Sequence, residues 1–363
     1  MINKTHLQLL AAFLLLLLVV PLTGVGAVKE GEREEAAPHA STQVSGANAD
    51  AGPAPFAATV LLNGELFAST DDQLLADSRV KEQMAYFTST GRSNFQNWLD
   101  QSLLFFPVMR DIFRAHKLPE NLVYIAMIES GFRFHAISRS HAVGPWQFMP
   151  ETAKKYGLVM NEWIDERRDP VKSTVAAAVY LKYLFGRFNS WPLTLASYNA
   201  GAGKVRRALL QSSDKGLTGL YGSRTIRRET KNYVPKLAAA IILTKEPVQY
   251  GFVVKKRLPF RYDVVRVGRG MNLQVIAAAA GCTVEEIKSL NPELTKEMIP
   301  PYAHDYPLRV PRGTKKNYLA SLRIHSVYHA YAGTRAETAY GRMNVRNAYE
   351  YALLRKRETF LSA

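Results

Sequence analysis

The chain has 363 residues and 47% hydrophobic residues, which is ordinary for a globular protein and enough for two domains. Its formal net charge is +16, yet the lysines and arginines are dispersed and no familiar nucleic-acid motif is present, so we expect no nucleic-acid partner. The single cysteine, Cys282, excludes a disulfide within the chain and leaves stability to the packed core.

The first residues have the features of an export signal. An apolar run from Leu9 to Val20 follows Lys4 and is too short to span a bilayer comfortably. Small residues then continue to Ala27. We expect residues 1–27 to be a signal peptide cleaved after Ala27, and the alternative is an uncleaved anchor.

A flexible linker and then a helical domain are expected next. Residues 28–79 form the linker, because the stretch up to Pro55 is rich in Ala, Gly, Pro, Ser and Glu and cannot bury enough apolar surface to order itself. From Val80 the pattern is helical, with apolar residues at spacings of three and four and no convincing strand up to Lys245. Expected helices include residues 98–113, 122–129, 170–188, 191–199, 204–210 and 230–244.

Glu129 is the most informative residue of this region. It ends an apolar stretch that begins at Leu122, and Gly131 follows at the usual place of a left-handed helix cap. Burial disfavours the charged form of a carboxyl, so Glu129 should retain its proton near neutrality, as a general acid for glycosidic cleavage must. Taken alone, a glutamate at a helix end would more commonly point into water.

Three further segments accompany Glu129 in order along the chain. They are residues 144–150 (GPWQFMP), 195–201 (LASYNAG) and 229–235 (ETKNYVP). Together they resemble the catalytic domain of the lytic transglycosylases, the goose-lysozyme-like enzymes that cut bacterial peptidoglycan. Residues 91–99 and 165–169 are most similar to the membrane-bound D subfamily, and the resemblance extends from about Val80 to Arg312.

The resemblance implies a mainly α protein with a lysozyme-like, all-helical catalytic domain over residues 80–250. It also implies peptidoglycan glycan strands as the partner and the periplasm of a Gram-negative bacterium as the location. Several members of the family are lipoproteins, but no cysteine follows the apolar run here, so we expect at most peripheral membrane association. Anionic wall polymer and phospholipid head groups would suit the basic surface.

The resemblance further implies a mechanism with one carboxyl group, which protonates the glycosidic oxygen and then deprotonates the attacking C6 hydroxyl. Glu129 would be this catalytic residue, and no water would be consumed. Polar helpers would replace a second acid. The positions that match substrate-binding residues of the family are Ser138, Gln147, Met149, Tyr198, Asn199, Glu229 and Tyr233. No convincing metal-ligand spacing or phosphate-binding loop is present, so we expect no cofactor and no metal.

Two other functions stay open at this point. A hydrolytic muramidase on the same fold would need a second carboxylate to position water, and Asp165, Glu166 and Asp169 are the nearby candidates. Arg167 and Arg168 lie between them, which favours a solvated or ion-paired loop. The second alternative is a non-catalytic peptidoglycan-binding protein.

Residues 260–312 are expected to form a small α+β module. Its predicted order is a strand, two helices and a strand, over residues 262–267, 273–280, 284–290 and 308–311. This order resembles a LysM module, a binder of N-acetylglucosamine-containing glycans, although a degenerate module that binds nothing is the alternative. We expect the module to be separable, so that a chain ending near Lys256 stays folded and active. Residues 313–363 are expected to be a basic tail, partly helical.

Overall fold

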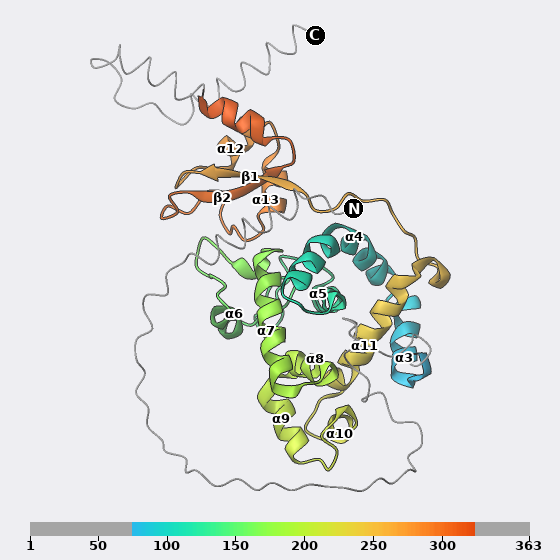
Figure 1. Cartoon of the computed structure of the whole chain (residues 1–363). Helices are drawn as coiled ribbons and strands as arrows, with labels where there is room; N and C mark the ends of the chain where they lie inside the picture. Colours follow the sequence, from blue (N-terminus) through green and yellow to red (C-terminus); the bar gives the residue numbers. More distant parts are fainter. Residues whose placement is uncertain (1–74, 324–363) are drawn as a thin grey trace, which may run out of the picture. The chain divides into compact units, whose positions relative to one another are not determined.

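The computed structural model describes residues 75–323 of the chain. The expected signal peptide, most of the expected linker and the distal part of the C-terminal tail lie outside this range. Within it, a series of helices is followed by a small unit with two strands, two helices between them and a further helical segment over residues 315–323 (Figure 1). The predicted mainly α architecture with a small α+β module at its C-terminal side is therefore confirmed.

The helical domain is built from short and medium helices. They are α3 (Ser78–Thr88), α4 (Arg92–Ala115), η1 (Glu120–Val123), α5 (Tyr124–Ser130), α6 (Pro150–Lys155), η2 (Glu166–Arg168), α7 (Lys172–Phe188), α8 (Trp191–Ala200), α9 (Ala202–Leu210), α10 (Leu217–Gly222), α11 (Arg228–Lys245) and η3 (Pro247–Tyr250).

Several helices begin away from their predicted first residues; α4, for example, begins at Arg92 instead of residue 98. Helix α3 begins two residues upstream of Val80 because the Asp77 carboxylate accepts the backbone N–H of Arg79 and caps the helix. Helix α7 begins at Lys172 instead of Pro170. The carboxylate of Asp169 still accepts two backbone N–H groups at this point, but it does so from three residues before the helix.

Helix α5 lies at the centre of the domain, among α4, α7, α8 and α11 (Figure 1). Every residue from Leu122 to Ile128 is between 0 and 4% exposed, because this segment is apolar on all sides. Helix α8 is also buried from Trp191 to Ser197. The core therefore holds α5 rigidly up to its last turn, where Glu129 follows Ile128.

The second unit is an antiparallel pair, β1 (Tyr262–Val267) and β2 (Tyr306–Pro311), with α12 (Leu273–Ala280) and α13 (Val284–Leu290) between the strands in sequence. Val264 is paired with Arg309 in this register. The first strand and both helices have the predicted bounds, while the second strand begins two residues earlier than predicted.

The boundary expected at residue 312 is wrong. Residues 315–323 are helical, and Tyr318 is only 2% exposed within the core of the module. Its hydroxyl donates a hydrogen bond to the carbonyl of Arg266. The first part of the expected tail thus belongs to the module, because the small sheet needs this aromatic side chain to complete its core.

Candidate active site

Glu129 is positioned by a helix end that only glycine can complete. Gly131 caps α5 with φ of 61° and ψ of 36°, the left-handed conformation predicted from the sequence. A Cβ at this position would lie 2.1 Å from Nε1 of Trp98, so the close packing also excludes a side chain. Ser130 donates a hydrogen bond of 3.1 Å to the carbonyl of Pro145 and ties the helix end to the next loop.

The carboxyl of Glu129 is surrounded by protein atoms, while the residue as a whole is half-buried. The hydroxyl of Tyr233 on α11 donates a hydrogen bond of 2.6 Å to Oε1 of Glu129. Burial raises the pKa of Glu129 and outweighs the opposing effects of this hydrogen bond and of the Lys236 charge. Glu229 adds to the rise through charge repulsion. The predicted shift in the pKa of Glu129 is therefore present and has the predicted cause.

Lys236 is a residue of this site that the sequence analysis missed. Its Nζ donates a hydrogen bond of 3.0 Å to the carbonyl of Ile128 and lies 5.8 Å from the ring centroid of Trp98. Burial lowers the pKa of Lys236, while the charges of Glu129 and Glu229 oppose that shift. The sequence contained one indication of this role. Lys236 follows Tyr233 by three residues on the same helix, and residues three apart lie on the same helix face.

Helix α8 contributes Tyr198 and Asn199 from its last turn. The Tyr198 hydroxyl donates a hydrogen bond of 2.7 Å to the carbonyl of Trp146, and burial raises the pKa of this tyrosine well above its ordinary value. Asn199 accepts a hydrogen bond of 2.7 Å from Thr230 on α11. Tyr198 thus stays protonated at neutral pH, and its oxygen can still accept a hydrogen bond from a ligand.

Three predicted residues lie on one loop, residues 136–149, which we call the Gln147 loop. Short antiparallel bridges pair Ile137 with Val143 and Val143 with Phe148. Gln147 has φ of 49°, and its amide nitrogen donates a hydrogen bond of 2.8 Å to the carbonyl of Gly144. Its amide oxygen accepts no hydrogen bond from the residues that the structure describes, so it is available to a ligand.

The other two predicted residues of the Gln147 loop have different surroundings. The Ser138 hydroxyl accepts the backbone N–H of Ala142 at 3.0 Å, so it is engaged in its own turn. Met149 precedes α6 and is 42% exposed, which rules out a role as core filler. Glu229 lies in the exposed first turn of α11. The structure joins Glu129 directly to Tyr233, whereas these three side chains make no hydrogen bond to Glu129.

Arg167 contacts the Gln147 loop and fixes its position. Its guanidinium binds both carboxylate oxygens of Asp165 at 2.9 Å and donates to the carbonyls of His141 and Phe148 at 3.0 and 3.3 Å. Its own carbonyl packs against Gly144, where a Cβ would lie 1.9 Å from the carbonyl oxygen. The loop that carries Gln147 is therefore fixed by side-chain and backbone contacts with η2.

The three candidate second carboxylates are all ion-paired and buried. Asp165 pairs with Arg167, Glu166 with Lys172, and Asp169 with Arg309. Burial alone would raise the pKa of Asp169, but the charges of Arg309 and Lys172 outweigh it and the pKa is lowered. The predicted ion-paired loop is confirmed, and the alternative of a solvated loop is wrong. Each of the three carboxylates forms an ion pair with a cationic side chain.

Other features of the described chain lie away from these residues. A hollow of about 410 Å³ is lined by residues of α4, η1, α5 and α11, including Arg110 and Tyr124, but by none of the predicted site residues. Between residues 75 and 323, no group of three or more His, Cys, Asp or Glu side chains could hold a metal ion. No helix in the same range is long and apolar enough to cross a membrane.

Comparisons with known proteins identify both parts of the chain. Residues 113–218 match the Transglycosylase SLT domain, and residues 261–326 match the LysM-like domain of lytic transglycosylase MltD. The chain is thus similar to an SLT domain in one stretch and to an MltD-type LysM-like domain in a later one. The resemblance to the lytic transglycosylases and to a LysM module is thereby confirmed. The SLT match covers α5, the Gln147 loop and α8, whereas α11 with Tyr233 and Lys236 lies beyond it.

Individual relatives match about half of the chain. Membrane-bound lytic murein transglycosylase D of Escherichia coli K12 is 34% identical over 184 residues, which cover 49% of this chain and 40% of that protein. Peptidoglycan transglycosylase gp16 of Escherichia phage T7 is 28% identical over 189 residues, 50% of this chain and 14% of the phage protein. The solved 70 kDa soluble lytic transglycosylase SLT70 of Escherichia coli is 20% identical, covering 49% of this chain and 32% of its own, with a TM-score of 0.36. The chain thus spans less than two thirds of the length of these relatives.

Proposed function

We propose that this chain is a peptidoglycan lytic transglycosylase of the Gram-negative periplasm. It would cleave the β-1,4 bond between N-acetylmuramic acid and N-acetylglucosamine without water and form 1,6-anhydro-muropeptides. The observation that carries this proposal is the carboxyl of the half-buried Glu129, which has a raised pKa and accepts a hydrogen bond from Tyr233. The SLT domain match supports the same reaction class.

The reaction needs one group that is first an acid and then a base. Protonated Glu129 gives its proton to the glycosidic oxygen as the bond to the anomeric carbon breaks, and the substrate's N-acetyl carbonyl stabilises the developing positive charge. The Glu129 carboxylate then takes the proton of the muramoyl C6 hydroxyl, whose oxygen bonds to the anomeric carbon. The enzyme ends in its starting protonation state, ready for the next cycle.

The surroundings of Glu129 suit both protonation states. Burial favours the acid before bond cleavage, while the Tyr233 hydroxyl and the Lys236 charge stabilise the carboxylate after it. A group that alternates between acid and base requires such a balance, because an extreme pKa in either direction would block one of the two steps.

The remaining predicted residues would bind the glycan. The free amide oxygen of Gln147 can accept from a sugar hydroxyl, and the exposed Met149 offers an apolar contact next to it. Tyr198 would support the positively charged anomeric centre through its oxygen. Substrate contacts of this kind are also proposed for Ser138, Asn199, Glu229 and Tyr233.

The main alternative is a hydrolytic muramidase, which would need a second carboxylate to position water. Asp165, Glu166 and Asp169 are paired with cations, so a water-positioning carboxylate would have to be Glu229. This residue is exposed and forms no ion pair within residues 75–323, and its charge acts on Glu129. A non-catalytic wall-binding protein is disfavoured, because binding alone does not require a carboxyl with a raised pKa that accepts a hydrogen bond from a buried tyrosine.

The products decide between these functions. Purified protein incubated with peptidoglycan sacculi is expected to release muropeptides that are one water lighter than lysozyme products and have no reducible end. Mass spectrometry before and after borohydride treatment measures both properties. Reducing muramic acid among the products would instead establish hydrolysis and direct attention to Glu229. Intact sacculi would support the non-catalytic alternative.

A second expectation concerns the pH dependence of activity. Glu129 must be protonated to start the reaction, so activity falls as pH rises through the pKa of Glu129. The positive charge of Lys236 lowers this pKa, and Lys236→Met should therefore raise it and move the alkaline fall of kcat/KM to higher pH. Tyr198 and Tyr233 have pKa values raised well above ordinary, so they do not titrate in this range.

Lys236→Arg is the matched control for that experiment, because it keeps the charge next to the carbonyl of Ile128. The pH at which kcat/KM falls on the alkaline side should lie closer to the wild-type value in Lys236→Arg than in Lys236→Met. Profiles of kcat/KM against pH on soluble glycan fragments provide the measurement. Coinciding profiles for all three proteins would mean that Lys236 does not act on Glu129.

A further inference from the structure

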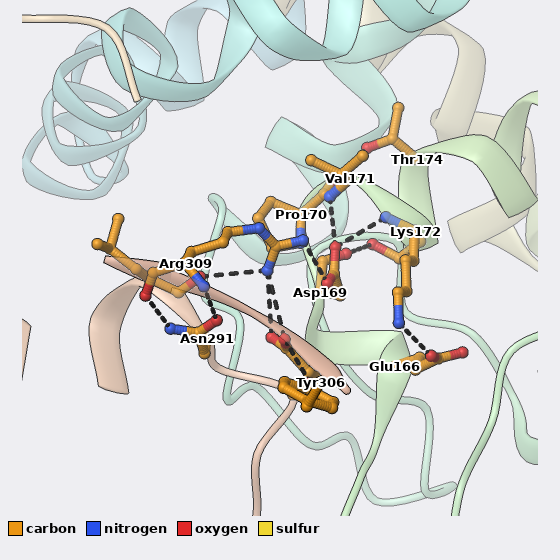
Figure 2. A network of polar contacts seen from close by, with 12 residues as sticks. Glu166, Asp169, Pro170, Val171, Lys172, Thr174, Asn291, Tyr306 and Arg309 are labelled. Atoms are coloured by element: carbon orange, nitrogen blue, oxygen red, sulfur yellow. Dashed lines mark hydrogen bonds and ion pairs between the residues drawn. The ribbon is translucent and has the colours of Figure 1, made fainter. Parts of the chain in front are cut away.

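A buried ion pair joins the LysM-like module to the helical domain. Asp169 is 0% exposed and Arg309 on β2 is 6% exposed. Nη2 of Arg309 lies 2.6 Å from Oδ2 of Asp169, whose Oδ1 accepts the backbone N–H groups of Val171 and Lys172. Figure 2 shows the Arg309 side chain directed at Asp169. Loss of either partner would leave the other charge buried without compensation.

The module holds Arg309 firmly on its own side. The Asn291 side chain donates to the carbonyl of Arg309 at 2.7 Å and accepts its backbone N–H at 2.9 Å (Figure 2). A second carboxylate, that of Glu293, lies 3.4 Å from Nη1 of Arg309 and accepts a hydrogen bond from Tyr306. One guanidinium is thus placed between two buried carboxylates, so its removal would expose Asp169 and Glu293 to mutual repulsion.

The segment before α7 also contacts the module through its backbone. It comprises residues 159–171, and we call it the η2 segment. The backbone N–H of Asp165 donates to the carbonyl of Glu293 at 2.8 Å, and that of Thr295 donates to the carbonyl of Trp163 at 3.0 Å. Ile164 is 6% exposed and lies in the hydrophobic core of the module. The module core is therefore completed by a residue of the helical domain.

These contacts contradict the expectation that the module is separable. A chain ending near Lys256 would lose Arg309 and leave the Asp169 carboxylate buried and unpaired. It would also expose Ile164. Periodicity and composition could not reveal this, because the strand and helix pattern of the module is the same whether or not its face is covered.

The η2 segment in turn holds the Gln147 loop. Asp165 orients the guanidinium of Arg167, which binds the loop carbonyls of His141 and Phe148. The carbonyl of Arg167 is packed against Gly144. A displacement of the η2 segment would therefore be transmitted to the Gln147 loop through contacts that leave little free space.

We propose that Arg309 is a positioning residue of the active site and that the LysM-like module fixes the loop that contacts the glycan. Arg309 fixes the position of Asp169 and, with it, the η2 segment. Arg167 of this segment then fixes the Gln147 loop through its contacts with that loop. The proposal rests on the proposed function, because glycan contact by Gln147 is part of it. It assigns the module a role in catalysis that is separate from any binding of glycan by the module itself.

The test compares three variants of the full-length protein. Arg309→Met removes the charge, Arg309→Lys keeps the charge but loses the fork of donors, and Arg266→Met is the matched control. Arg266 lies on the other strand of the module, and its pair with Asp305 is exposed. Hydrogen exchange of the backbone amides of residues 141–148 is measured, together with kcat and KM on soluble glycan fragments.

Arg309→Met is expected to speed exchange in residues 141–148 while amides of α5 and α11 keep their protection. Its kcat/KM should fall by about ten- to a hundredfold, mainly through KM, because Glu129 and Tyr233 are untouched while the glycan contacts are displaced. Arg309→Lys should fall between Arg309→Met and the wild type. Arg266→Met should match the wild type in both measurements.

Unchanged exchange and unchanged KM in Arg309→Met would overturn the proposal. Equal acceleration of exchange in α5, α11 and the Gln147 loop would also overturn it, since Arg309 would then be a purely structural residue. If Arg309→Met does not fold, Arg309→Lys decides through the same comparison of the loop with α5 and α11. The exchange measurement is independent of the product analysis, so reducing products would refute the proposed function and leave this result standing.

Discussion

Replacement of Glu129 with glutamine is expected to lower turnover by a factor of about a hundred to ten thousand, the usual contribution of one acid–base group. The amide keeps the shape of the side chain and can still accept the hydrogen bond from Tyr233. It has no proton to give to the glycosidic oxygen. Thermal stability should be unchanged or slightly higher, because a buried acid in an apolar setting is costly.

Glu82→Gln is the matched control for this variant, since Glu82 is exposed on α3 and takes no part in the proposed site. Release of muropeptides from sacculi gives the turnover, and binding of Glu129→Gln to the same sacculi should remain close to that of the wild type. Near-normal turnover in Glu129→Gln would refute the assignment of the acid. Lost binding together with lost turnover would show that the substitution had disturbed the fold.

Gly144→Ala is expected to be among the most destabilising single substitutions in the helical domain. Gly144 has φ of 83°, which costs a residue with a side chain about 1–2 kcal/mol. The new Cβ would also lie 1.9 Å from the carbonyl oxygen of Arg167, and displacement of packed backbone adds about 1–3 kcal/mol. The unfolding free energy should therefore fall by about 2–5 kcal/mol in all. Activity should fall as well, because the Gln147 loop must move.

Gly157→Ala separates the two contributions. Gly157 has nearly the same φ, 82°, but no atom lies within 4 Å of a Cβ built there. The unfolding free energy of Gly157→Ala should fall only by the conformational cost of about 1–2 kcal/mol. The variant should retain its activity. Urea denaturation of both variants gives the difference in unfolding free energy. Equal losses in the two variants would mean that the contact between Gly144 and η2 is not tightly packed.

Much of the local structure could be predicted from the sequence. The bounds of α12, α13 and β1 follow from apolar spacing and capping residues, which act over only a few positions. The left-handed cap at Gly131 is equally local. The sequence also pointed to Glu129 and Tyr233, which the structure joins by a hydrogen bond, through an apolar helix and the motifs of a known family.

Tertiary structure alone decided which charged groups meet. Arg167 and Arg168 next to Asp169 pointed only to a solvated or ion-paired loop, whereas the partner of Asp169 is Arg309, 140 positions later in the chain. Lys236 reaches the carbonyl of Ile128 over a separation of 108 positions. Rules of periodicity and capping describe neighbours along the chain, so they carry no information about contacts that form only when distant segments pack. For the same reason the sequence could outline the LysM-like module but could not show that its core includes Ile164 and that its arginine holds the segment beside the Gln147 loop.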